Sequence, residues 1–247
     1  MSVLSTPSTH ILAIEVSNPS ASSPEAGSMR PGVVVALREN NSCRLLARED
    51  IDPARAHDDL LMVAIDRAMR TAGLTPRQIG VVAVSAGPGG YTAVRLAVTT
   101  AKLIAEATGA ACIAIPTSDC VAHRVDNSLA RFAVALASKG TTSYVTVYDN
   151  PATPRSPGAV IDADALAALG VRTMIADRFL SASFKVAAEL QGISIIPPVF
   201  DALACAEIAH RYPSVDPLLL APLYPREPEA VTKWRELKEK RASLGNA

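Results

Sequence analysis

The sequence predicts an α/β protein of two domains, and three observations support this prediction. Short apolar runs rich in β-branched residues alternate with longer segments in which apolar residues recur every three or four positions. The second half of the chain repeats the strand and helix order of the first half more loosely. The chain has 247 residues, of which 49% are apolar, so it can bury one large core or two smaller ones.

The clearest element order lies between residues 79 and 108. Val81 to Val84 form a short β-branched run between turn residues, which predicts a strand covered on both faces. A glycine-rich turn, Gly87-Pro88-Gly89-Gly90, ends this strand. Apolar and small residues then recur at helical spacing over residues 91–108, which predicts an amphipathic helix.

The rest of the first half predicts an antiparallel meander followed by a helix. Residues 18–32 contain three prolines and two glycines, so we expect a loop there. Residues 116–118 predict a hinge, and the first domain is expected to cover residues 10–118. Its other predicted elements are strands over 11–17, 33–37, 44–48 and 111–115 and a helix from 53 or 57 to 72.

The second half predicts a smaller domain over residues 119–227 and a helical tail over residues 228–247. Val231, Trp234 and Leu237 share one helical face of the tail, so we expect that face to dock on the protein. The predicted elements of this half are helices over 119–124, 163–169, 182–191 and 202–211 and strands over 132–137, 143–148, 172–176 and 193–196.

Charge and composition argue against several classes of protein. The chain has 24 basic and 24 acidic residues, so it has no basic excess of the kind that grips nucleic-acid backbone. No apolar run has the length of a membrane span, and residues 1–10 lack a secretory signal pattern. The four cysteines form no Cys-x-x-Cys pair, so we expect reduced thiols and a cytoplasmic protein.

The sequence shows no established catalytic or metal-binding motif. The glycine-rich turn fits neither the P-loop nor the dinucleotide fingerprint, which leaves a tight structural turn or an anion site as its two interpretations. His57 stands beside Asp58 and Asp59 at a predicted helix start, where acids suit the helix dipole; a metal at His57 and Asp58 is the alternative. Glu15 and Ser17 end the first strand, where α/β proteins often position reactive groups.

Taken together, several segments resemble the TsaB (YeaZ) family in their order and spacing. Residues 87–95 are similar to the Gly-Pro-Gly-Ser-Phe-Thr-Gly-Leu-Arg signature of that family. The resembling segments are residues 11–17, 56–61, 79–96 and 222–226, followed by Ala230.

The resemblance implies an ASKHA fold, the two-lobed fold of actin and Hsp70, in which each lobe is a mixed sheet with flanking helices. It also implies a part in adding threonylcarbamoyl to adenosine 37 of tRNAs that read ANN codons. Proteins of this family are not the catalyst. They dimerise with the catalytic paralogue TsaD, allow the ATPase TsaE to join, contact tRNA only indirectly and form homodimers when alone.

The resemblance further implies the location of the working residues. The partner surface is expected on the helices near residues 57–72 and 91–108, whose buried and interface faces the sequence does not distinguish. We expect no catalytic residue and no metal, with ATP or ADP at most at a partner interface. The predicted partner-binding residues are Leu61, Ile65, Met69, Val94, Ala97 and Ala101, and the predicted nucleotide-binding residues are Glu15, Ser17, Gly87 and Gly89.

Two departures from the family pattern argue against independent nucleotide binding. Glu15 stands where the family usually has Asp, and residues 137–139 replace a frequent Asp-Ala-Arg. The alternative functions are an ATP-binding ASKHA enzyme, either a phosphotransferase or a peptidase-like relative, and a homodimer that uses the same helices.

Overall fold

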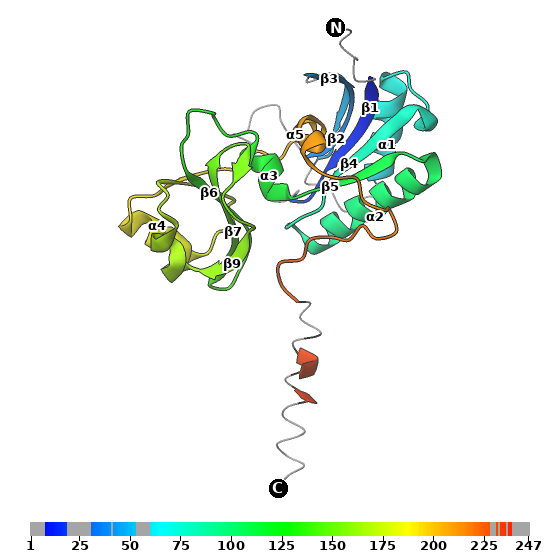
Figure 1. Ribbon diagram of the computed structural model, residues 1–247. Helices are drawn as coiled ribbons and strands as arrows, with labels where there is room; N and C mark the ends of the chain where they lie inside the picture. Colours follow the sequence, from blue (N-terminus) through cyan, green and yellow to red (C-terminus); the bar gives the residue numbers. More distant parts are fainter. Residues whose placement is uncertain are drawn as a thin grey trace.

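A computed structural model describes residues 8–18, 31–40, 42–52 and 60–227 and six residues of the tail, 231, 233–235 and 237–238. The protein has two lobes, each built on one β-sheet with helices packed against it (Figure 1). The prediction of an α/β protein with two lobes, each a mixed sheet with flanking helices, is therefore confirmed. Among the described residues, no helix is both long and apolar enough to cross a membrane.

The first lobe contains a mixed five-stranded sheet with the order β3-β2-β1-β4-β5. β1, β2 and β3 form the predicted antiparallel meander, whereas β4 pairs in parallel with β1 and with β5. α1 connects β3 to β4 and α2 connects β4 to β5, which gives the long crossover that parallel strands need. The elements are β1 (Thr9–Glu15), β2 (Gly32–Glu39), β3 (Ser42–Asp50), α1 (Leu60–Thr71), η4 (Pro76–Gln78), β4 (Ile79–Ser85), α2 (Tyr91–Thr108) and β5 (Ala111–Ile115). Most of the predicted loop over 18–32 and the predicted helix start at 53–59, including His57, lie outside the described residues.

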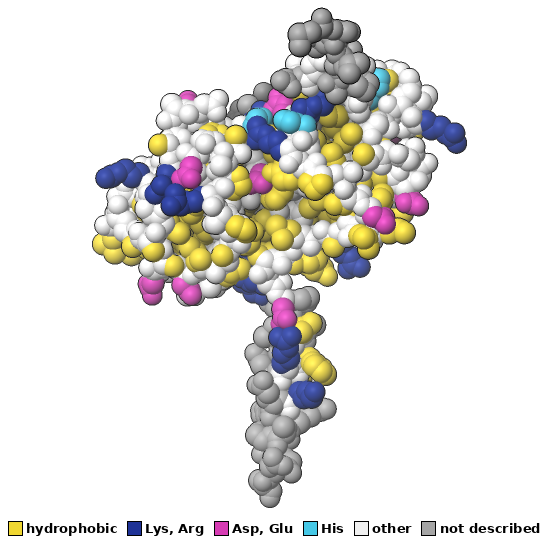
Figure 2. Space-filling model, in the orientation of Figure 1, with side chains coloured by type: hydrophobic (Ala, Val, Ile, Leu, Met, Phe, Trp, Pro, Cys, Tyr) yellow, Lys and Arg dark blue, Asp and Glu magenta, His cyan; other side chains and the backbone are white. Residues whose placement is uncertain are grey.

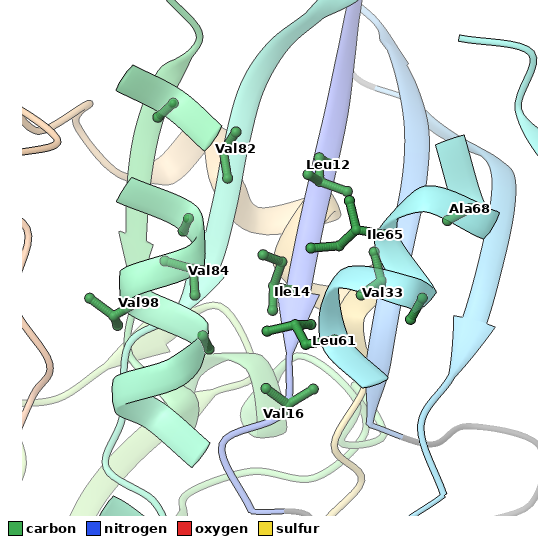
Figure 3. Close-up of a cluster of buried hydrophobic side chains, with 14 of the residues drawn as sticks. Leu12, Ile14, Val16, Val33, Leu61, Ile65, Ala68, Val82, Val84 and Val98 are labelled. Carbon is green, nitrogen blue, oxygen red and sulfur yellow. The ribbon is translucent and has the colours of Figure 1, made fainter. Parts of the chain in front are cut away.

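Alternate residues of this sheet face two separate apolar layers. Leu12 and Ile14 of β1 point toward α1 and α2, together with Val82 and Val84 of β4 (Figure 3). Ile11, Ala13 and Ala83 point to the opposite face, which is covered by a later helix. Because strand side chains alternate between faces, a strand buried on both faces is apolar throughout, as the run from Val81 to Val84 is.

The second lobe contains a six-stranded sheet with the order β11-β10-β6-β7-β8, in which β9 also pairs with β7. Residues 163–169 fold as a 3-10 helix, and the other predicted elements of this lobe lie within two residues of their observed bounds. The elements are β6 (Phe132–Lys139), β7 (Thr142–Asn150), β8 (Thr153–Pro154), β9 (Ala159–Asp162), η5 (Ala163–Leu169), β10 (Thr173–Ala176), α4 (Ala182–Leu190) and β11 (Ser194–Ile196).

The chain passes between the lobes twice, through α3 (Thr117–Ala122) and through the segment before α5 (Ala202–Ile208). α5, followed by η6 (Ala209–Arg211), packs against the open face of the first sheet, and Leu220 lies in the first-lobe core. The predicted second domain over 119–227 is therefore wrong at its C-terminal end. A helical period shows that α5 has a buried face, but it does not show which sheet that face covers.

The described residues of the tail do not dock on the lobes. Trp234 and Leu237 are 60% and 57% exposed, although they share an apolar helical face with Val231. The predicted docking of this face within the chain is therefore wrong for the part of the tail that the structure describes.

Candidate functional site

The six residues predicted to bind a partner lie in the core of the first lobe. They are between 0% and 6% exposed and pack against β1, β2 and β4. This prediction is wrong, because the small side chains of α2 bring that helix close to its own sheet rather than to a partner. The six residues are Leu61, Ile65 and Met69 of α1 and Val94, Ala97 and Ala101 of α2.

The opposite sides of the same two helices carry large apolar side chains in solvent. Met62 of α1 is 56% exposed and Leu103 of α2 is 65% exposed. Figure 2 shows hydrophobic side chains gathered on the first lobe where α2 lies. We refer to the exposed residues Met62, Val63, Leu96 and Leu103 as the outer face of α1 and α2.

Two further features adjoin this outer face. A groove of about 240 Å³ runs between α1 and α2, with Met62 and Ile104 among its lining residues. The segment with Leu218 and Leu219 is held beside α2, because Lys102 Nζ donates a hydrogen bond to the Leu218 carbonyl oxygen at 3.0 Å. The side chains of both leucines are exposed. Together they extend the apolar surface beyond the four residues of the outer face.

The glycine-rich turn before α2 packs tightly against the end of β1. The Gly90 amide donates to the Ser17 carbonyl oxygen at 2.8 Å, and the Thr117 amide donates to the Gly87 carbonyl oxygen at 2.8 Å. A Cβ atom placed on Gly89 would lie 2.4 Å from the Ser17 oxygen. These contacts favour the structural interpretation of the turn over an anion site, because the Gly90 amide already has a partner.

We predict that Gly89→Ala destabilises the protein by about 1–3 kcal/mol, because the added methyl group overlaps the Ser17 carbonyl oxygen and forces a backbone shift. Urea unfolding measures this loss. Gly90→Ala is the matched control, since its Cβ would lie 3.6 Å from the same oxygen, an ordinary contact distance. Equal stability of the two variants would show that the turn is not tightly packed.

Glu15 and Ser17 are wholly buried and bonded to each other. Glu15 Oε1 accepts hydrogen bonds from the Ser17 amide at 2.7 Å and from Ser17 Oγ at 2.6 Å. Burial raises the pKa of the Glu15 carboxyl despite these bonds from Ser17. Of the four residues predicted to bind nucleotide, only Gly89 lines the cleft described next, and Glu15, Ser17 and Gly87 lie outside its lining.

A cleft of about 580 Å³ opens between the two lobes. Aromatic Tyr91 and Tyr224 stack on one side of it with ring centroids 5.0 Å apart. Its lining residues are Asn18, Gly89, Gly90, Tyr91, Ala137, Ser138, Lys139, Asp177, Phe179, Tyr224, Pro225, Arg226 and Glu227.

The segment from Leu223 to Arg226 ties the two lobes together across this cleft. The Leu223 amide donates to the Ala86 carbonyl oxygen in the first lobe at 2.7 Å. The Arg226 guanidinium donates to the Ala137 carbonyl oxygen at 2.5 Å and to Thr142 Oγ1 at 2.7 Å in the second lobe. The resembling segment 222–226 was the only sequence signal for this contact.

A second set of polar contacts joins the two passages between the lobes. Asp201, which is 1% exposed, accepts hydrogen bonds from Arg48 Nη2 at 2.6 Å and from Arg124 Nε at 2.7 Å. Asp119 accepts hydrogen bonds from the hydroxyl groups of Tyr148 and Tyr212. Sequence reasoning missed this network because its members are up to 153 positions apart.

The described histidines do not contribute to the cleft. His10 bonds to the Gln78 carbonyl oxygen, His123 Nε2 lies 3.0 Å from Glu207 Oε2, and His210 bonds to the Glu207 carbonyl oxygen. None of these three lines the cleft between the lobes. Within the described residues, the cleft therefore has no histidine for acid-base catalysis or metal binding.

The two sheets, their flanking helices and the cleft between the lobes define a protein of the ASKHA class. The family model of TsaD, described as tRNA N6-adenosine threonylcarbamoyltransferase, matches residues 51–174, which is half of the chain. The chain belongs to this family.

Individual relatives match the chain over a shorter stretch. A tRNA N6-adenosine threonylcarbamoyltransferase of Bradyrhizobium diazoefficiens is 56% identical over 52 residues, and one of Afipia carboxidovorans is 50% identical over 52 residues. Each match covers 21% of this chain and spans only 15% of the length of the curated relative.

Solved structures match nearly the whole fold. YeaZ from Pseudomonas aeruginosa superposes with a TM-score of 0.65 at 16% identity, covering 87% of this chain and all of YeaZ. A second crystal structure is described as an uncharacterized protein with similarity to peptidase YeaZ from Pseudomonas aeruginosa. It superposes with a TM-score of 0.65 at 19% identity, and the match covers 88% of this chain and the whole of the other chain. The fold is that of the YeaZ proteins, so the resemblance to the TsaB (YeaZ) family is confirmed at the level of the fold.

Proposed function

We propose that this chain is a cytoplasmic, non-catalytic scaffold subunit of the complex that adds threonylcarbamoyl to adenosine 37 of ANN-decoding tRNAs. In this proposal it dimerises with a TsaD-like catalytic subunit through the outer face of α1 and α2. The observation that carries the proposal is this outer face, which exposes four large apolar side chains on adjacent helices.

An exposed apolar surface of this kind is typical of a protein interface. Met62 and Leu103 are each more than half exposed, and the groove between α1 and α2 offers a recess for an apolar side chain of the partner. The nearby charges of Asp66 and Arg70 already pair with each other at 2.9 Å, so they need no partner charge on binding. The surface therefore suits an apolar partner helix better than a charged ligand such as tRNA.

The two polar residues at the end of β1 support the non-catalytic part of the proposal. Glu15 and Ser17, at the end of β1, are bonded to each other and buried, so they do not face a nucleotide there. We propose that any ATP or ADP lies at the junction with the catalytic subunit. In the same proposal a TsaE-like ATPase joins the assembled pair, tRNA contacts this chain only indirectly, and the chain alone uses the same outer face to form a homodimer.

We predict that Leu103→Glu lowers affinity for the cognate TsaD-like protein at least tenfold, because the interface would bury an unpaired carboxylate, and a tenfold loss corresponds to about 1.4 kcal/mol. Co-purification with the tagged partner, followed by a binding titration, measures the loss. Leu190→Glu on α4 is the matched control, since Leu190 is 82% exposed and lies in the other lobe.

The control variant is expected to bind like the original chain, and circular dichroism is expected to show that both variants are folded. The proposal is contradicted if the original chain does not bind the partner, or if Leu103→Glu binds as tightly as Leu190→Glu. Sedimentation of the chain alone tests the homodimer, which Leu103→Glu is expected to dissociate.

The size of the cleft favours one alternative, an ATP-binding enzyme of the ASKHA class. Tyr91 and Tyr224 offer an aromatic surface, and Lys139 offers a positive charge near it. Isothermal titration with Mg-ATP separates the two functions. The scaffold proposal expects no binding by the isolated chain, whereas the alternative requires binding without a partner.

A further inference from the structure

Three side chains that can bind a metal meet beneath the passages between the lobes. Cys120 lies on α3, Cys205 lies on α5, and Glu15 ends β1. The two sulfur atoms are 3.1 Å apart, and one ligand atom from each of the three residues lies within 4.8 Å of the others. All three residues are completely buried, which places the cluster inside the protein rather than in the cleft.

One oxygen of this cluster has no partner. Glu15 Oε1 accepts two hydrogen bonds from Ser17, but the buried Glu15 Oε2 accepts none of normal geometry, although the Ser85 hydroxyl also interacts with this carboxyl. Buried polar atoms ordinarily have a partner, so this oxygen requires an explanation.

We propose that Glu15 Oε2, Cys120 Sγ and Cys205 Sγ bind one zinc ion. Thiolates with a carboxylate form a donor set that suits zinc rather than magnesium or calcium, which prefer oxygen ligands alone. On binding, Zn²⁺ replaces the proton of each thiol, so two protons leave for solvent and both sulfurs become thiolates. Zinc–sulfur bonds of about 2.3 Å in a tetrahedral site would separate the sulfurs to about 3.8 Å, a small opening from 3.1 Å. The Ile14 carbonyl oxygen, 4.0 Å from Cys205 Sγ, is the candidate for a fourth ligand.

The position of the cluster gives the ion a mechanical role. α3 carries the chain out of the first lobe and α5 brings it back, so the ion would fasten both passages to β1. Cys120 packs in the first-lobe core, whereas its neighbours Val121 and Ala122 pack in the second-lobe core. A bound ion would therefore limit the movement of one lobe relative to the other.

Metal analysis of the full chain, purified under reducing conditions without chelator after exposure to Zn²⁺, tests this proposal. We expect about one zinc per chain, and a higher melting temperature with zinc than after chelation. Replacement of zinc by Co²⁺ is expected to give the charge-transfer absorption of two thiolates and the visible bands of a tetrahedral site. Cys120→Ser and Cys205→Ser are expected to lose the metal, and Glu15→Gln to weaken its binding.

A double variant, Cys43→Ser with Cys112→Ser, keeps the test decisive if the single variants fail to fold. The chain has four cysteines, so this variant retains only Cys120 and Cys205. An unchanged cobalt spectrum in it assigns both thiolates to the cluster. The proposal is overturned if the original chain binds neither zinc nor cobalt, if Cys120→Ser binds as much metal as the original chain, or if the two sulfurs are found as a disulfide in the purified reduced protein.

Discussion

Ala101→Glu is expected to unfold the first lobe. Ala101 is completely buried where α2 packs against β4, so a glutamate there has neither room nor a partner for its charge. An uncompensated buried charge costs about 3–5 kcal/mol, a large part of the 5–15 kcal/mol by which domains are usually stable. Circular dichroism and urea unfolding of the full chain measure the loss.

The matched control for this result is Leu103→Glu on the same helix. Leu103 is exposed, so its replacement is expected to leave the unfolding midpoint nearly unchanged while it weakens partner binding. The two variants separate folding from binding within one helix. A folded Ala101→Glu variant that fails to bind the partner would instead place Ala101 at the interface and contradict the observed packing.

Asp201→Ala is expected to destabilise the protein by about 3–5 kcal/mol. The substitution leaves the guanidinium groups of Arg48 and Arg124 without their common carboxylate. It also removes the N-cap of α5, because Asp201 Oδ1 accepts a hydrogen bond from the Leu203 amide at 3.1 Å. Thermal and urea unfolding of the variant measure the effect.

Asp149→Ala provides the control for this loss. Asp149 also contacts two arginines, Arg131 and Arg155, but those ion pairs lie on the surface in solvent. Such pairs add little to stability, so this variant is expected to unfold at nearly the original midpoint. Equal loss from Asp149→Ala and Asp201→Ala would show that burial of the Asp201 network contributes nothing.

Local sequence pattern predicted most of the secondary structure. The observed bounds of α2 and β5 coincide with the predicted ranges 91–108 and 111–115. In both cases turn residues mark the ends, and the final turn of α2 is followed by Gly109 in the left-handed conformation. The fold class followed from the same patterns together with the family resemblance.

Predictions that depended on contacts between distant residues were less accurate. Helical periodicity located the apolar stripe of α2, yet it did not show that Ala97 and Ala101 face the sheet while Leu103 faces solvent. Helical periodicity also did not show which sheet the buried face of α5 covers, so the prediction assigned α5 to the second lobe although it packs on the first. Cys120 and Cys205 are 85 positions apart, so no motif in the sequence indicated that their sulfurs meet.

The most direct test of the scaffold proposal is reconstitution of tRNA threonylcarbamoylation from purified components. The assay would combine an ANN-decoding tRNA, the threonylcarbamoyl donor, the cognate TsaD-like and TsaE-like proteins, and this chain. We expect product to depend on this chain, to form with Leu190→Glu and to be lost with Leu103→Glu. Full activity without the chain, or equal activity with both variants, would contradict the proposal that its outer face of α1 and α2 assembles the complex.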